Sequence, residues 1–169
     1  LENFKKLSSK GNLIPVYKKI KIDVENPSMF LKKIQNEENI YLLESYEGPK
    51  KWSRYSFMGF DPKYIFSSFK NKIKISGTNK SKQITGCPFD ELKKIIKKYK
   101  PVKLKTLPRF YGGFVGFFSY EIISQIERIP RFTKDDTNFP DCNFMFSDSL
   151  VIFDNLKKSA KVVVNVEVN

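Results

Sequence analysis

Residues 111–118 read YGGFVGFF, a stretch that combines five apolar side chains with three glycines. It is too apolar to face solvent, and the absence of side chains at the glycines allows another backbone to come close. The stretch therefore predicts a buried central strand around which the rest of a sheet is arranged.

Helical patterns lie on both sides of this strand. Within residues 88–98, Phe89, Leu92 and Ile95 recur at helical spacing opposite four lysines. A brief helix is expected after Ser119, and another is expected from Pro27, which suits the first helical position. The sequence thus predicts about three helices.

Strand patterns occupy much of the remaining chain. Lys70-Asn71 separates two of them and predicts an antiparallel hairpin, whereas residues 77–86 and the polar stretch up to Asn138 predict loops. Further strands are expected at residues 13–22, 41–43, 54–59, 143–146, 150–153 and 161–168. The prediction is an α+β fold, with mainly antiparallel β-sheets packed as a sandwich and about three peripheral helices.

The charge and the titratable residues limit the possible functions. The formal net charge is +13, but only four of the 31 basic residues are arginine. A lysine-rich surface is more typical of a solvated exterior than of base or phosphate recognition, which favours arginine. The chain has no histidine, and its two cysteines match no zinc or redox spacing. Catalysis by this chain alone is therefore not expected.

Membrane insertion and secretion are not indicated. No uninterrupted apolar stretch reaches the roughly 18 residues that a membrane-spanning helix needs, and the chain does not open with a signal peptide. A cytoplasmic location is expected. The chain stops at Asn169, directly after an apolar strand, which suggests that it belongs to a longer protein.

Three segments resemble the amino-terminal region of the anthranilate synthase component I family. The first is LLES at residues 42–45, followed by RYSFMG at 54–59 and DP at 61–62. The second is GGFVGFFSYE at 112–121, and the third runs from Pro140-Asp141 through FMF at 144–146 to VIFD at 151–154. Their order and spacing cover nearly the whole chain.

This resemblance implies one amino-terminal regulatory domain over residues 1–169, with the carboxy-terminal chorismate-binding domain absent. It also implies part of a feedback pocket for L-tryptophan, whose remaining wall lies outside this chain. Glu44 and Ser45 would lie closest to the amino acid. The other expected ligand contacts are Leu43, Tyr55 and Phe57 around the indole, Ser56, and Arg54 or one of Lys50 and Lys51 at the carboxylate. Without the resemblance, Glu44-Ser45 reads as a strand end that caps a turn.

The resemblance implies further properties for the full-length parent. That parent would be a lyase that converts chorismate to anthranilate in tryptophan biosynthesis. It would use Mg²⁺ and ammonia, and a glutamine amidotransferase subunit would deliver the ammonia. For residues 1–169 alone, no cofactor, no metal site and no catalytic residue are expected.

Two alternatives remain open. One is the same domain of aminodeoxychorismate synthase component I, a paralogue in folate synthesis, although the intact LLES at 42–45 favours anthranilate synthase. The other is a basic nucleic-acid-binding module, which would need exposed aromatic side chains on one sheet face. Phe114, Phe117 and Phe118 are expected to lie too deep in an apolar run for that role, so no nucleic-acid partner is predicted.

Overall fold

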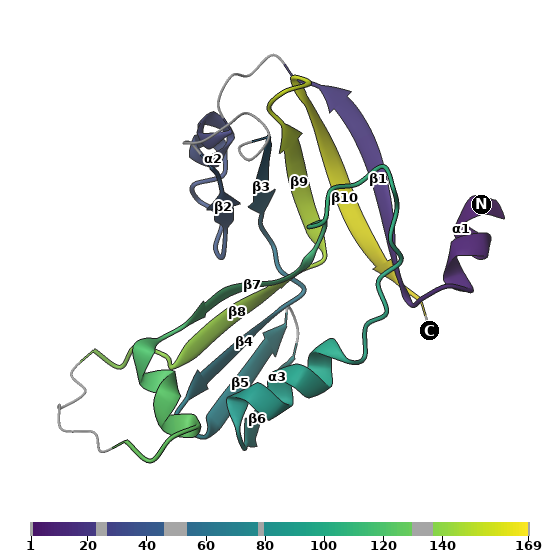
Figure 1. Cartoon of the computed structure of the whole chain (residues 1–169). Helices are drawn as coiled ribbons and strands as arrows, with labels where there is room; N and C mark the ends of the chain where they lie inside the picture. The colour runs from purple at the N-terminus through teal and green to yellow at the C-terminus, as the bar shows by residue number, and fades with distance from the viewer. Residues whose placement is uncertain (1, 23–26, 46–53, 78–79, 130–136, 169) are drawn as a thin grey trace. The chain divides into compact units, whose positions relative to one another are not determined.

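A computed structural model describes residues 2–22, 27–45, 54–77, 80–129 and 137–168 (Figure 1). The chain divides into two units, each of which has its own five-stranded sheet. Unit 1 comprises Leu1–Pro62, Tyr99–Gly113 and Ser147–Asn169, and unit 2 comprises Lys63–Lys98 and Phe114–Phe146.

The sheet of unit 1 has the strand order β1-β10-β9-β3-β2, and all its pairings are antiparallel. Its outer strand β2 has only three residues and pairs with β3 alone (Figure 1). The strands are β1 (Leu13–Lys21), β2 (Tyr41–Leu43), β3 (Tyr55–Gly59), β9 (Ser149–Asp154) and β10 (Ser159–Glu167).

Both faces of this sheet carry apolar side chains, because successive side chains along the central strands point to opposite faces and join a different cluster on each. On one face, helix α2 (Ser28–Lys33) packs on Met58 and Phe153, and the rings of Phe30 and Phe153 are 5.4 Å apart. On the other face, the segment 99–113 packs over Leu150 and Ile152. A further helix, α1 (Glu2–Ser8), precedes β1.

The sheet of unit 2 has the strand order β6-β5-β4-β8-β7. One face carries a core of Phe66, Ile73 and Cys142, against which Leu92 of helix α3 (Pro88–Ile96) packs. The strands are β4 (Tyr64–Phe69), β5 (Lys72–Gly77), β6 (Ser81–Thr85), β7 (Gly113–Phe118) and β8 (Cys142–Ser147), and the helices are α3 (Pro88–Ile96) and the 3-10 helix η1 (Tyr120–Gln125).

The predicted α+β class, with two mainly antiparallel sheets and a few peripheral helices, is confirmed. One local prediction is wrong, and one helix was missed. Residues 77–86 were expected to be a loop, but Ser81–Thr85 form β6, because a polar sequence is compatible with an edge strand that faces water. Helix α1 was not predicted at all.

The third correction concerns the glycine-rich strand. It was expected to be central, but β7 is an edge strand, and the side chains of Phe117 and Phe118 are 37% and 43% exposed. Aromatic neighbours shield the rest of both rings: Phe117 stacks on Phe139 at 5.1 Å, and Phe118 lies 4.7 Å from Phe144. Burial of these rings therefore does not argue against a nucleic-acid partner.

In the described parts of the chain, no helix has both the length and the apolar character needed to span a bilayer.

Candidate functional site

The segment expected to hold a ligand begins at the end of β2. Leu43 is the last residue of this strand, pairs directly with Phe57 of β3 and is 44% exposed. Glu44 and Ser45 follow it outside regular structure, and both are exposed to solvent. Lys50 and Lys51, the alternative carboxylate partners, lie outside the described residues.

The position of β2 is fixed by a partly buried tyrosine. The Tyr41 hydroxyl and the Ser147 Oγ are 2.8 Å apart, and the Ser147 hydroxyl is 3.1 Å from the Ser149 carbonyl oxygen, to which it donates. Burial raises the pKa of Tyr41, although the hydrogen bond with Ser147 opposes this shift. Gly59 leaves room for the Tyr41 ring, since a Cβ there would lie only 2.6 Å from the Tyr41 hydroxyl. These contacts hold β2 in place beside β3, and they thereby fix the start of the segment that carries Glu44 and Ser45.

Arg54 is engaged by an acidic side chain of the neighbouring strand. Its Nε and one terminal nitrogen donate to the two Asp154 carboxylate oxygens at 3.1 and 2.8 Å, and its guanidinium lies 4.8 Å from the Tyr55 ring centre. Burial raises the pKa of Asp154, but hydrogen bonds from Arg54 and from the Lys157 backbone outweigh it and hold the pKa below its usual value. The Nε edge of the guanidinium is thus already occupied by Asp154, and only its other edge, formed by the two terminal nitrogens, could meet a ligand carboxylate.

The three expected residues of β3 do not share one face. Tyr55 and Phe57 belong to the cluster beneath the segment 99–113. Ser56 points to the opposite face, is fully buried, and its hydroxyl accepts a hydrogen bond from the Asn155 side-chain amide at 3.1 Å. The structure therefore brings Tyr55 and Phe57 together and separates Ser56 from them.

Next to Tyr55 and Phe57 lies an open hollow of about 600 Å³, whose other lining residues are Pro108, Arg109 and Phe110. The Phe57 and Phe110 rings meet edge to face at 5.1 Å, and the Tyr55 and Phe57 ring centres are 6.3 Å apart. Because Leu43 and Phe57 are directly paired, the Leu43 side chain lies on this same sheet face. The hollow combines aromatic walls with one exposed cation, which suits an aromatic ligand that carries a carboxylate.

Arg109 was missed by the sequence reasoning. It stands between a proline and a phenylalanine directly ahead of the glycine-rich strand, and it is one of only four arginines. An isolated arginine in a lysine-rich chain is a usable signal, because arginine is the better partner for a carboxylate. What could not be read from the sequence is that the segment 99–113 crosses the face of β3.

The described residues offer no metal site. No group of three or more histidine, cysteine, aspartate or glutamate side chains within them could hold a metal ion. Of the two free cysteines, Cys142 is buried, and its burial raises the pKa of the thiol despite a hydrogen bond with Ser68.

Comparison with known proteins gives a consistent family. The model of a family described as chorismate binding enzyme matches residues 38–169. Anthranilate synthase component 1 of Acetivibrio thermocellus is 38% identical over 170 residues, which is 100% of this chain and 34% of that protein. The protein of the same name from Aquifex aeolicus is 36% identical over 98% of this chain and 34% of its own length.

A solved structure supports the fold. The crystal structure of anthranilate synthase component I from Streptococcus pneumoniae aligns with a TM-score of 0.54 at 23% identity, and the alignment covers 88% of this chain and 31% of that one. The chain thus spans about a third of the length of the curated relatives that it matches.

Proposed function

The chain belongs to the family of chorismate binding enzymes, and on that premise we propose that it is the N-terminal, tryptophan-sensing domain of an anthranilate synthase component I. The observation that carries this proposal is the match of its whole length to a third of two relatives that bear that name. The longer protein would act in the cytoplasm as a lyase that converts chorismate to anthranilate. It would use Mg²⁺ and take ammonia from a glutamine amidotransferase subunit.

The described residues offer no group of ligands for the Mg²⁺ of this enzyme, and we place the ion in the part of the longer protein that this chain does not cover. The chain also contains no histidine, the residue most often used as a general acid or base. Its own contribution would be regulatory: it would supply one side of a pocket whose occupation by tryptophan disfavours chorismate binding.

The proposed pocket follows the end of β2 and the hollow beside β3. The Glu44 carboxylate would pair with the tryptophan ammonium, and the Ser45 hydroxyl would donate or accept a short hydrogen bond. The exposed Leu43 side chain and the rings of Tyr55 and Phe57 offer an apolar wall for the indole. Glu44 and Ser45 are solvent-exposed in this chain, so the site needs a further wall to exclude water from these contacts.

The experiment that tests the function uses the full-length protein that contains this sequence. We expect it to release anthranilate from chorismate with ammonia, which anthranilate fluorescence would follow, and we expect tryptophan to inhibit this release. The 169-residue chain alone should show no chorismate turnover. Turnover by the chain alone would contradict the regulatory assignment. Release of aminodeoxychorismate in place of anthranilate would favour the paralogue in folate synthesis.

Arg109 supplies a sharper test of the pocket. Because Asp154 already engages Arg54, we propose that Arg109 contacts the tryptophan carboxylate. Replacing a charge-assisted contact at an exposed position should weaken inhibition by about tenfold, so Arg109→Gln in the full-length enzyme should raise the tryptophan concentration for half inhibition by that factor. Arg128→Gln, which removes an exposed arginine of unit 2, is the control and should leave it unchanged. Equal inhibition curves for both variants would contradict the role of Arg109. Arg54, Lys50 or Lys51 would then be the candidate partner of the tryptophan carboxylate.

A further inference from the structure

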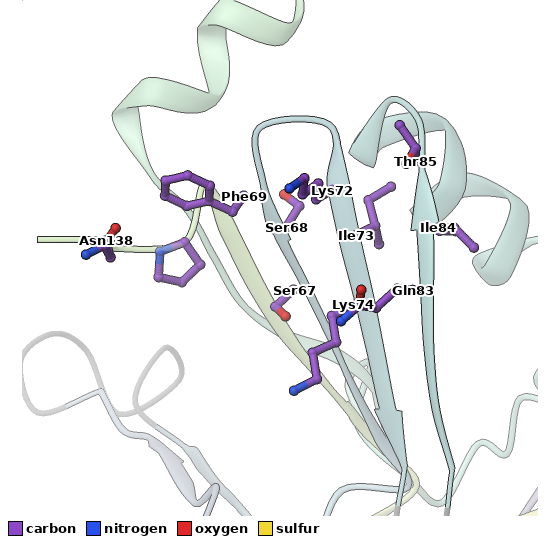
Figure 2. A pocket seen from close by; sticks show the side chains of 11 residues that line it. Ser67, Ser68, Phe69, Lys72, Ile73, Lys74, Gln83, Ile84, Thr85 and Asn138 are labelled. Atoms are coloured by element: carbon purple, nitrogen blue, oxygen red, sulfur yellow. The ribbon is translucent and has the colours of Figure 1, made fainter.

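A second hollow, of about 610 Å³, lies on the sheet of unit 2 and is independent of the proposed function (Figure 2). Strands β4, β5 and β6 supply most of its lining, and Asn138 and Pro140, just ahead of β8, supply the rest. The side chains that concern the argument are Ser67, Phe69, Lys72, Lys74, Gln83 and Thr85. In Figure 2, Phe69 stands on the side of Asn138, Thr85 stands on the far side, and the two lysines lie between them.

The strand register explains why these side chains gather on one face. Ser67 pairs with Lys74, and Lys74 pairs with Gln83, so the three form a row across the sheet. Phe69, Lys72 and Thr85 form the next row in the same way. Directly paired residues of antiparallel strands project to the same side, and residues two apart on one strand do so too. Two adjacent rows therefore present two ammonium groups, two hydroxyls, an amide and an aromatic ring to one hollow.

The opposite face of these strands is occupied by the core. Ile73, which lies between the two lysines in β5, is 1% exposed and packs with Phe66 and Leu92 beneath helix α3. This burial fixes the pairing register of β5, because a shift of the register by one residue would turn both lysines towards the core. Lys72 and Lys74 are thereby held on the face of the hollow.

The electrostatics of the hollow are one-sided. No carboxylate is among its lining residues, and within the described residues neither Lys72 nor Lys74 forms a salt bridge. A third ammonium is near, since the Nζ of Lys70 lies 5.7 Å from the Phe69 ring centre. The carboxylate of Asp141 is buried and accepts a hydrogen bond from the Lys70 backbone N–H. Among the described residues that line the hollow, the charged side chains are therefore the ammonium groups of Lys72 and Lys74.

We propose that this hollow binds the phosphate group of a small phosphorylated molecule. Residues two apart on a strand are separated by about 7 Å, so a phosphate placed between the side chains of Lys72 and Lys74 can accept from both ammonium groups. The Ser67 and Thr85 hydroxyls and the Gln83 amide are further donors on the same face. The Phe69 ring and Pro140 form an apolar wall against which the organic part of the ligand can rest.

The test uses the 169-residue chain labelled with ¹⁵N, titrated with inorganic phosphate at constant ionic strength and followed by amide chemical shifts. We expect saturable shifts at Ser67, Lys74 and Gln83. The double variant Lys72→Gln/Lys74→Gln should bind phosphate at least about tenfold more weakly. The control Lys93→Gln/Lys97→Gln removes the same charge from exposed positions of α3 and its end, on the other side of the sheet, and should bind like the parent chain.

Three results would overturn the proposal. The first is a set of shifts that grows linearly and is reproduced by sodium chloride, because this indicates ionic strength alone. The second is equal weakening in both double variants, because this indicates net charge in place of a site. The third is binding of a single-stranded oligonucleotide with no saturable binding of free phosphate, because the source of the phosphate would then be a nucleic acid. Phenyl phosphate should bind more tightly than inorganic phosphate, and loss of that difference in Phe69→Ala would support the apolar wall.

Discussion

Replacing Ser45 with phenylalanine in the full-length enzyme should remove most of its inhibition by tryptophan while leaving the uninhibited rate near normal. Ser45 is exposed after β2, so the larger side chain can be accommodated by the domain itself without a packing cost. At the proposed pocket it would remove a hydroxyl partner and crowd the ligand. An unmade buried hydrogen bond alone costs about 1–3 kcal/mol, which is roughly a five- to 150-fold loss of affinity.

Inhibition curves at fixed chorismate concentration measure this effect. Ser9→Phe, which adds the same bulk at another exposed position of unit 1, is the matched control and should retain normal inhibition. Because tryptophan and chorismate would weaken each other reciprocally, the Ser45 variant should also bind chorismate equally well with and without tryptophan. A variant that stays fully sensitive to tryptophan would show that Ser45 is not in the pocket. Calorimetry on the 169-residue chain should show weak or undetectable tryptophan binding, because the proposed pocket needs a second wall.

The elements that were predicted correctly are those whose pattern is local. Helix α3 has its apolar residues at helical spacing and acidic residues in its first turn, and the β4-β5 hairpin has a clear turn at Lys70-Asn71. In the structure Lys70 has a φ of 54°, a conformation that a tight hairpin turn commonly requires. These features need no information from distant parts of the chain.

The glycine-rich strand shows where local reasoning fails. An apolar run predicts burial, but it does not tell whether one or both edges of the strand are paired. In β7 the aromatic side chains are shielded by rings from other segments, such as Phe144 and Phe139, and Phe139 is itself 58% exposed. The error at β6 is of the opposite kind. Its polar sequence predicted a loop, but these residues form a strand that pairs with β5.

Some features of the candidate site could likewise be predicted from local sequence, and others could not. Leu43, Tyr55 and Phe57 share a sheet face, as alternation along β3 and pairing with β2 require. Alternation also places Ser56 on the other face, and this follows from the sequence once β3 is accepted as a strand. The Arg54 and Asp154 pair and the approach of Arg109 depend on residues about 100 and 50 positions away along the chain, so no local pattern could reveal them.

Gly116→Ala should be among the most destabilising single substitutions that add only one methyl group to this chain. A Cβ at Gly116 would overlap the Asn143 carbonyl oxygen and lie 2.7 Å from the Phe144 Cα, and both atoms belong to the backbone of β8. Backbone atoms cannot rotate away as the end of a flexible side chain can, so β7 must separate from β8 or both strands must bend.

Overpacking of this kind typically costs about 1–3 kcal/mol, and each kcal/mol lowers the Tm of a domain of this size by roughly 2–4 °C. Thermal unfolding followed by circular dichroism measures the shift. Gly86→Ala is the matched control: its new Cβ would meet only the Glu91 side chain at 3.7 Å, an ordinary contact, so its Tm should stay within about 2 °C of the parent. If Gly116→Ala unfolds at the same temperature as Gly86→Ala, then β7 is not held against β8 as closely as the structure places it, and the close approach of the two backbones is not what the glycine provides.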